Sequence, residues 1–184
     1  MHKNLLSSNR TALIIIDFQE AFKKAIPEYA NLLTSISIAA KGFGLLGCPV
    51  FVTEQYPKGL GHTDSQILDQ LPPNIEIFEK STFSACGAPE FIDALQAANI
   101  SQTVLCGVEA HICVNQTALA LLENNFEVHI LEDGVGSRKL DNKKSALTKM
   151  YKFGAIPACL EMSLFEVMGT SKNPNFKEIQ NLIK

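Results

Sequence analysis

The chain has 184 residues, of which 46% are hydrophobic and 19% are charged, and its formal net charge is −3. This composition is typical of one globular domain with a sizeable core and excludes a mainly disordered chain. Sixteen basic residues face nineteen acidic ones, so we expect no nucleic-acid partner. No apolar run reaches the roughly 18 residues of a membrane-spanning helix, so we expect no membrane partner.

The first ten residues hold no apolar stretch long enough for a secretory signal, so a cytoplasmic location is expected. Five cysteines are present, an odd number, and no two of them form a C-x-x-C pair. This argues against a disulfide framework.

Short apolar runs alternate with helical stretches along the chain. Thr11–Ile16 is a continuous apolar run, which predicts a strand buried on both faces. The elements expected after it, in chain order, are a helix over 27–46, a strand over 49–53, a long loop over 54–73, a strand over 75–78, a helix over 89–98, a strand over 103–107, a helix over 111–125, a strand over 127–131, a helix over 141–153, a strand over 155–159, and helices over 161–168 and 174–183.

Six strands joined by helices predict an α/β fold with three layers (α/β/α) around a mostly parallel six-stranded sheet. We expect a single domain over 1–184, with its core over about 11–168 and a helical tail over 169–184. In such sheets, ligands bind beyond the carboxyl ends of the strands. Asp17, Lys80 and Cys113 each follow an expected strand, so an acid, a cation and a nucleophile should meet at one edge of the sheet.

Each of these three residues has two interpretations. Cys113 is a nucleophile at a helix start, where the helix dipole lowers the pKa of a thiol, or it is a small buried hydrophobic residue. Asp17 is a general base and acid, or a turn cap. Lys80 is a cation that stabilises the thiolate, or a solvated lysine at a strand end.

The usual signatures of metal and nucleotide cofactors do not occur. The four histidines, His2, His62, His111 and His129, lack metal-ligand spacing, as do the cysteines. The sequence contains no GxGxxG, no GxxxxGK[ST] and no GxSxG pattern. We therefore expect neither a metal nor another cofactor.

Four segments carry a family resemblance: IIIDFQEAF (14–22), EKSTFSA (79–85), CGVEAHICV (106–114) and VHILEDGVGSR (128–138). In order and spacing they resemble the isochorismatase-like cysteine hydrolases, the superfamily that includes nicotinamidases, N-carbamoylsarcosine amidases and isochorismatases. VTEQYPKGLGHT (52–63) most resembles the branch named isochorismatase domain-containing proteins. The resemblance implies the Rossmann-like isochorismatase fold and a homo-oligomer, dimer or tetramer.

The resemblance also implies a catalytic triad. Cys113 would attack a small substrate, Asp17 would take and return the proton, and Lys80 would orient and polarise the pair. A cis peptide between Val108 and Glu109 would direct the N–H of Glu109, with that of Cys113, toward the oxyanion. The implied reaction is hydrolysis of an amide-like C–N bond through a thioester, without a cofactor.

Two departures from the family bear on the substrate. Nicotinamidases carry an Asp-x-His metal pair after the second strand, where this chain reads TEQY (53–56), so we expect no metal and doubt nicotinamidase activity. Isochorismatases cleave a vinyl ether, which does not require a cysteine. Cys113 favours amide-like substrates, while ether hydrolysis and a non-catalytic thiol redox or binding protein remain open alternatives.

Aromatic and polar residues beside the motifs predict a site for a small, flat or apolar substrate, although Phe22 and Phe83 could equally belong to the core, and Gln55 and Tyr56 to a loop. The expected substrate-binding residues are Phe18, Phe22, Gln55, Tyr56, Phe83, His111 and Ile112. Asp133 and Arg138 are expected to brace the loop after the fifth strand. The amphipathic tail packs on its own domain or on a neighbouring copy.

Overall fold

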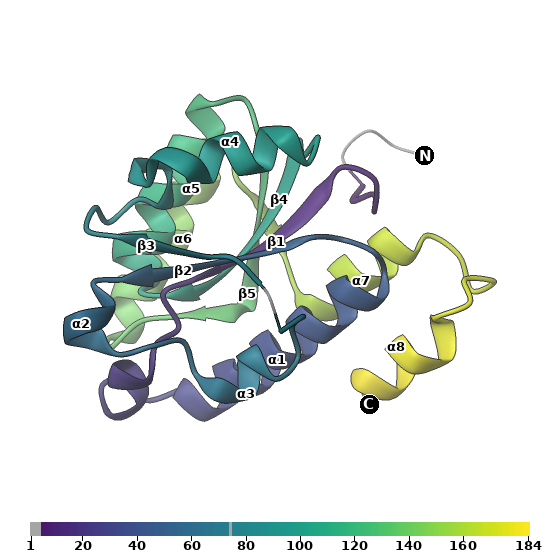
Figure 1. Cartoon of the computed structure of the whole chain (residues 1–184), viewed down its shortest axis with the longest axis horizontal. Coiled ribbons are helices and arrows are strands. Elements are labelled where there is room, and N and C mark those ends of the chain that lie inside the picture. Colours follow the sequence, from purple (N-terminus) through teal and green to yellow (C-terminus); the bar gives the residue numbers. More distant parts are fainter. Residues whose placement is uncertain (1–4, 74) are drawn as a thin grey trace.

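The computed structural model describes residues 5–73 and 75–184 and contains a central six-stranded sheet (Figure 1). The strands are β1 (Thr11–Ile16), β2 (Val50–Gln55), β3 (Ile77–Lys80), β4 (Gln102–Val108), β5 (Glu127–Gly136) and β6 (Ile156–Ala158). Their order in the sheet is β3-β2-β1-β4-β5-β6, and all five neighbouring pairs are parallel. The expected parallel α/β sheet is therefore confirmed.

Helices cover both faces of the sheet. They are α1 (Tyr29–Leu45), α2 (Pro57–Leu60), α3 (Ser65–Leu68), α4 (Pro89–Ala97), α5 (Asn115–Glu123), α6 (Leu140–Lys152), α7 (Leu160–Met168) and α8 (Phe176–Leu182), with the short segments η1 (Glu20–Lys24), η2 (Ala85–Gly87) and the π-helical turn η3 (Ala110–Val114). Apolar residues of α1, α7 and α8 pack on one face, and those of α4, α5 and α6 pack on the other. This is the expected three-layer arrangement.

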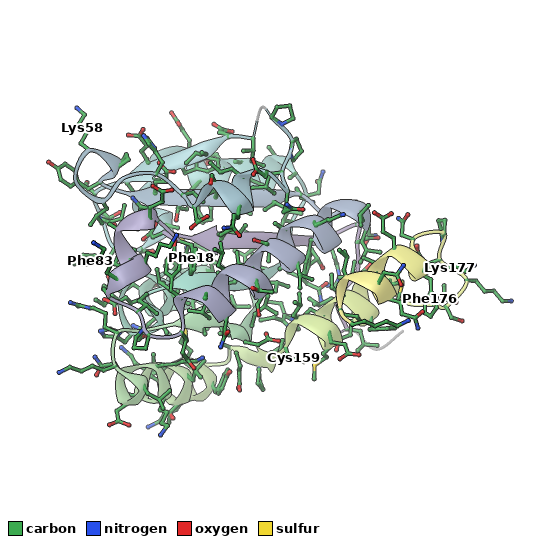
Figure 2. All side chains as sticks on the ribbon, turned by 90° about the horizontal axis from the view of Figure 1, so that it is seen from below. Phe18, Lys58, Phe83, Cys159, Phe176 and Lys177 are labelled. Atoms are coloured by element: carbon green, nitrogen blue, oxygen red, sulfur yellow. The ribbon has the colours of Figure 1, made fainter. Side chains whose placement is uncertain are left out.

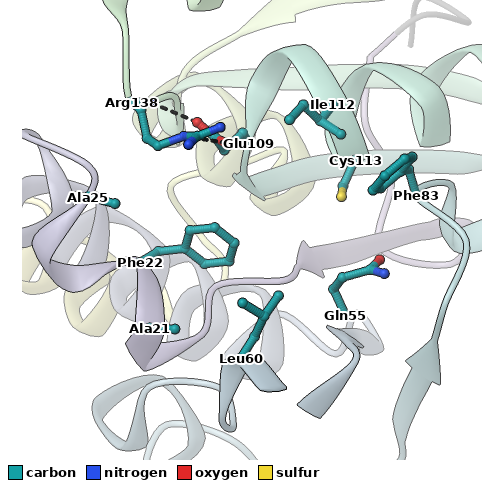
Figure 3. A pocket seen from close by; sticks show the side chains of 10 residues that line it. All are labelled: Ala21, Phe22, Ala25, Gln55, Leu60, Phe83, Glu109, Ile112, Cys113 and Arg138. Atoms are coloured by element: carbon teal, nitrogen blue, oxygen red, sulfur yellow. Dashed lines mark hydrogen bonds and ion pairs between the residues drawn. The ribbon is translucent and has the colours of Figure 1, made fainter. Parts of the chain in front are cut away.

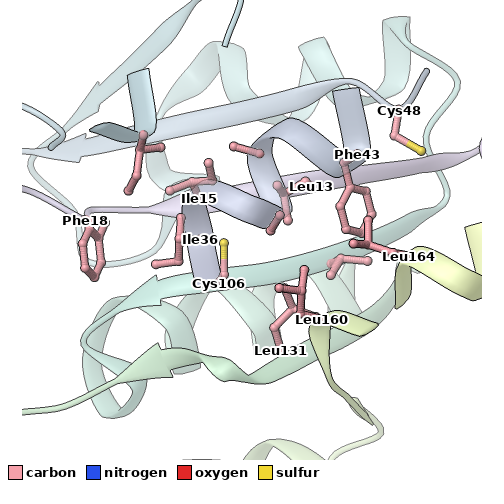
Figure 4. Packing of buried hydrophobic residues seen from close by; sticks show 14 of the residues in the cluster. Leu13, Ile15, Phe18, Ile36, Phe43, Cys48, Cys106, Leu131, Leu160 and Leu164 are labelled. Carbon is pink, nitrogen blue, oxygen red and sulfur yellow. The ribbon is translucent and has the colours of Figure 1, made fainter. Parts of the chain in front are cut away.

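Strand β1 lies at the centre because both of its faces are apolar. Leu13 and Ile15 face the layer of α1 and α7 (Figure 4), whereas Ile14 and Ile16 face the layer of α4 and α5. All four side chains are fully buried. Alternate residues of one strand thus join both halves of the core.

The chain reverses its direction of travel across the sheet between β1 and β4. From β1 it runs outward to β2 and β3, and it then returns to β4 on the other side of β1. Gly107 makes close contact possible there, because it has φ +115° and a Cβ would lie 2.0 Å from the carbonyl oxygen of Ile16. The crevice beyond this strand pair is where ligands bind in open parallel sheets.

The main correction concerns the segment expected to be a long loop over 54–73. Strand β2 continues through Gln55, and α2 and α3 follow it. Pro57 lies in the first turn of α2, and Asp64 caps α3 by accepting a hydrogen bond from the N–H of Gln66. Helices of one turn are too short to produce a recognisable apolar period.

Strand ends also differ from expectation. Strand β3 begins and ends later in the chain than the expected strand over 75–78, so Lys80 is its last residue and not the residue that follows it. β5 continues past Leu131 to Gly136 through the exposed Glu132 and Asp133, and a register irregularity between Leu105 and Gly107 of β4 accommodates it. The polar pair interrupts the apolar pattern, so the sequence indicates too short a strand.

The C-terminal helix packs on its own domain. Ile179 is fully buried in the core cluster, and Phe176 contacts Phe165 of α7 edge to face. Figure 2 shows Phe176 at the opposite end of the molecule from Phe83. In the part of the chain that the structure describes, no helix combines the length and apolarity required to cross a bilayer.

Candidate functional site

Asp17 lies immediately beyond β1 and is completely buried. Its φ of +51° is uncommon for a residue with a side chain and lets the chain turn sharply after the strand. Its Oδ1 accepts a hydrogen bond of 2.7 Å from the hydroxyl of Thr53, and its Oδ2 accepts one of 2.6 Å from Nζ of Lys80. The carboxylate is therefore held from two sides.

Lys80 is 6% exposed, so the interpretation as a solvated lysine is wrong. Besides Asp17, its ammonium group donates to Oε1 of Gln55 at 2.7 Å and to the carbonyl oxygens of Phe83 at 3.1 Å and Thr82 at 3.2 Å. Burying a lone ammonium would be costly, but here a carboxylate and three neutral oxygens surround it. Parallel pairing of β2 with β3 brings these groups together, since Gln55 lies opposite Lys80.

Cys113 lies in the turn η3 after β4 and is 7% exposed. Burial, and next the negative charge of Asp17, raise the pKa of its thiol to about 12, whereas the positive charge of Lys80 lowers it. The expected lowering of this pKa is therefore wrong for the free protein. Burial disfavours the thiolate, and the charge of Asp17, which raises the pKa, outweighs the opposite effect of Lys80.

The peptide bond between Val108 and Glu109 is cis. The Glu109 carboxylate accepts a hydrogen bond from the backbone N–H of Arg138 at 2.8 Å and another from its Nε at 2.9 Å. The end of β4 is thus tied to the segment that follows β5.

A pocket of about 310 Å³ opens beside Cys113 (Figure 3). Its lining residues are Ala21, Phe22, Ala25, Gln55, Leu60, Phe83, Glu109, Ile112, Cys113 and Arg138. Of the three candidate catalytic residues, Cys113 lines the pocket, while Asp17 and Lys80 are buried and interact with its thiol. The walls are mainly apolar, and the volume suits a small molecule.

Four of the seven expected substrate-binding residues line this pocket: Phe22, Gln55, Phe83 and Ile112. The other three do not. Phe18 is fully buried and stacks on Tyr29, with ring centroids 4.5 Å apart.

Tyr56 is 60% exposed and lies in a separate depression beside Glu79 and Ser81. His111 does not line the pocket, and its ring nitrogens contact the hydroxyl of Ser137, just after β5, at 3.0 Å and the amide of Asn142 in α6 at 3.3 Å.

Sequence reasoning missed three residues that shape the site. Thr53 binds Asp17, and Arg138 lines the pocket instead of only bracing a loop. Gln19 is buried and pairs its side-chain amide with the backbone of Gln55, accepting from its N–H at 2.9 Å and donating to its carbonyl oxygen at 3.1 Å. The available signal for Gln19 was its place two positions after Asp17 in the segment IIIDFQEAF.

Asp133 lies within β5 rather than in a loop after it, and it braces the start of α7, because both of its carboxylate oxygens accept from the N–H of Leu160, each at 3.0 Å. Within residues 5–73 and 75–184, no cluster of three or more His, Cys, Asp or Glu side chains could hold a metal ion.

Comparison with known proteins agrees with this architecture. Isochorismatase domain-containing protein 1 of Salmo salar is 39% identical over 175 residues, which make up 95% of this chain and 61% of the relative. The chain thus spans about three fifths of that relative's length. Isochorismatase domain-containing protein 2 of Danio rerio is 34% identical over 179 residues, covering 97% of this chain and 89% of the relative.

Among solved structures, the "MAR1 Ribonuclease from Caenorhabditis elegans" is similar, with a TM-score of 0.90 and 37% identity. The match covers 97% of this chain and 92% of that one. The family model described as the isochorismatase domain matches residues 11–162. With the parallel sheet and the sequence relatives in agreement, the chain belongs to the isochorismatase family.

Proposed function

We propose that this protein is a cysteine hydrolase that cleaves a small amide-like C–N bond through a thioester, with Cys113, Asp17 and Lys80 as its catalytic residues. The observation that carries the proposal is the buried pair of Asp17 and Lys80, 2.6 Å apart, acting on a thiol at the wall of a pocket. A nucleophile beside a group that can accept its proton meets the basic requirement of nucleophilic catalysis, and a neighbouring cation stabilises the thiolate that forms.

In the proposed first half-reaction, Asp17 takes the thiol proton as the sulfur of Cys113 attacks the carbonyl carbon. The substrate oxygen that becomes negatively charged accepts hydrogen bonds from the backbone N–H groups of Glu109 and Cys113. The C–N bond then breaks, the amine leaves with the proton from Asp17, and the acyl group remains on sulfur.

Water completes the cycle. It gives a proton to Asp17 and attacks the thioester, the carboxylic acid leaves, and the same proton returns to the sulfur. A protonated thiol in the resting protein suits this sequence, because Asp17 is a neighbouring acceptor for its proton at the moment of attack. Lys80 donates to Asp17, Gln55 and two carbonyl groups, so its role is to position and neutralise rather than to touch substrate.

The proposal is tested by screening small amides, a vinyl ether and a short RNA for turnover in the wild type, Cys113→Ala and the control Cys159→Ala. We expect amide hydrolysis, lowered about a thousandfold or more in Cys113→Ala and retained in Cys159→Ala. Intact-mass measurement should also reveal an acyl group on Cys113. Ether cleavage that survives in Cys113→Ala would instead favour the ether-hydrolase alternative.

The RNA arm is included because the similar C. elegans structure is titled a ribonuclease. The pocket walls do not favour this activity. Among its ten described lining residues Arg138 is the only cation, and Glu109 already pairs with it. Phosphodiester binding draws on several cations.

A further inference from the structure

Gln19 is fully buried, and the amide at the end of its side chain is bonded to backbone on every side. Its Oε1 accepts from the N–H of Gln55 at 2.9 Å, and its Nε2 donates to the carbonyl oxygens of Gln55 at 3.1 Å and of Gly61 at 2.6 Å. Gln19 precedes η1, yet its side chain makes no capping hydrogen bond there. The amide is therefore committed to the end of β2 and to the segment after α2.

These hydrogen bonds continue the sheet where β1 has ended. The N–H of Asp17 bonds to the carbonyl oxygen of Thr53 at 3.1 Å, across the pair of β1 and β2. Every second residue of β2 turns its backbone groups toward β1, so Gln55 follows Thr53 in this series. The chain has turned sharply at Asp17, where φ is +51°, and the Gln19 side chain supplies the next acceptor and donor in place of the strand.

The side chain of Gln55 extends this constraint to Lys80. Its Oε1 accepts from Nζ of Lys80 at 2.7 Å, and its Nε2 donates to the carbonyl oxygen of Ser81 at 2.9 Å. Although burial raises the pKa of the Cys113 thiol, Lys80 acts to lower it. A change at Gln19 can thus reach the thiol through Gln55 and Lys80, although Gln19 itself does not line the pocket.

The second contact of the amide lies next to the pocket wall. Gly61, at φ +72°, follows Leu60, which lines the pocket. Figure 3 shows Leu60 and Gln55 along the same side of the pocket. One buried side chain therefore holds both of the segments that form this side.

We propose that Gln19 is a positioning residue of the site, and that its side-chain amide, by completing the sheet at the end of β2, fixes the Gln55 side chain that orients Lys80. For its effect on turnover the inference rests on the proposed hydrolase function, whereas its effect on the thiol does not. An amide suits this place because it carries a donor and an acceptor side by side, as a peptide group does. Its removal leaves three buried backbone groups without their partner, so the end of β2 must shift to satisfy them.

The test is a double-substitution cycle on Gln19 and Gln55, read as the rate at which iodoacetamide labels Cys113 at pH 9. Gln19→Met keeps the length of the side chain and removes its hydrogen bonds, and Gln55→Ala removes the contact with Lys80. Peptide mass spectrometry, with Cys159 in the same digest as the internal reference, gives the rate in the wild type, the two single variants and the double variant.

We expect Gln19→Met to slow the labelling of Cys113 about threefold in the wild-type background, because a displaced Lys80 stabilises the thiolate less. In the Gln55→Ala background, where the contact is already absent, the same substitution should leave the rate unchanged. Slowing by the same factor in both backgrounds would assign Gln19 a purely structural role and overturn the proposal. An unchanged or faster rate in the wild-type background would overturn it too.

The matched control is Gln102→Met. Gln102 is also fully buried and also uses its side-chain amide on several partners, among them the carbonyl oxygen of Leu5 at 3.1 Å. It lies at the start of β4, whereas Cys113 follows the end of that strand. Both substitutions should lower the midpoint of urea unfolding, and only Gln19→Met should slow the labelling of Cys113. Equal slowing by Gln102→Met would attribute the effect to general destabilisation and overturn the proposal.

A second variant covers the case in which circular dichroism shows that Gln19→Met does not fold. Gln19→Asn keeps an amide but is shorter by one CH₂ group, so it cannot keep all three hydrogen bonds at their present lengths. It takes the place of Gln19→Met in the cycle, with the same expected pattern.

Failure of this inference is distinguishable from failure of the hydrolase proposal, because labelling requires no turnover. Amide hydrolysis together with a Gln19 effect that is independent of Gln55 rejects the positioning role and leaves the hydrolase. A Gln19 effect that requires Gln55, together with no turnover of any amide, rejects the hydrolase and leaves a lysine positioned beside a thiol.

Discussion

The ionisation of Cys113 offers a direct test of how the three central side chains interact. With its pKa raised to about 12, the thiol holds only about one thiolate in ten thousand molecules at pH 8. An ordinary cysteine, with a pKa of about 8.5, holds about one in four at that pH. Iodoacetamide should therefore label Cys113 about a thousandfold more slowly than an unperturbed thiol.

Two substitutions should move this rate in opposite directions. Lys80 lowers the pKa of Cys113, so Lys80→Met should raise that pKa further and slow labelling at pH 8. Asp17 raises it, so Asp17→Asn should lower the pKa and speed labelling. Each neighbour is expected to change the rate about tenfold, the equivalent of one pKa unit.

The assay is peptide mass spectrometry between pH 7 and 11, with Cys159 in the same digest as the internal reference and circular dichroism as the check on folding. Labelling of wild-type Cys113 faster than Cys159 at pH 8, with a midpoint at or below pH 8.5, would refute the reasoning. The effect of burial on the pKa of Cys113 would then be outweighed by an interaction that stabilises the thiolate and that is absent from the contacts described above.

Three further predictions concern the packing of Gly107, the hydrogen bond between Thr53 and Asp17, and the buried thiol of Cys48. Gly107→Ala should lower the free energy of unfolding by about 3 kcal/mol or more in urea titrations, because the new methyl group would meet the β1 backbone; Gly44→Ala, with open space around it, should not destabilise. Thr53→Val should lower kcat/KM about tenfold by removing the 2.7 Å hydrogen bond to Asp17, and Thr53→Ser should restore it; unchanged kinetics in both would exclude a positioning role. Burial raises the pKa of Cys48 to about 12, so the folded protein holds this proton more tightly than the unfolded chain does. The contribution of Cys48 to the free energy of unfolding is therefore fully present below about pH 8.5 and is lost as the pH rises toward 12. In urea titrations over this range, Cys48→Ala should lose stability less steeply than the wild type.

The sequence was most informative where one physical requirement acts on each residue. The run Thr11–Ile16 predicted a strand buried on both faces, and the structure confirms it. Asp17, Lys80 and Cys113 were found as candidates because each lies at or just beyond a strand end. A parallel sheet brings such ends to one edge whatever their separation along the chain.

What the sequence could not indicate depends on side-chain direction and on the balance of opposing effects. Tyr56 and Gln55 are neighbours in the chain, yet Gln55 faces the pocket and Tyr56 faces solvent, because the backbone turns at φ +40°. The pKa of Cys113 depends on burial and on two opposite charges, none of which a helix-start position reveals. From the sequence Arg138 was expected only to brace a loop, and its position in the pocket wall depends on the folded structure.

The hydrogen bonds of Lys80 also bear on how the pocket wall can change over evolution. The ammonium group holds the segment after β3 through the carbonyl oxygens of Thr82 and Phe83, not through their side chains. Any amino acid supplies that carbonyl, so the residue at position 83 can be exchanged while the anchor persists. Lys80 thus permits the side chain at position 83 of the pocket wall to change, and with it the shape of the pocket, without loss of its own hydrogen bonds.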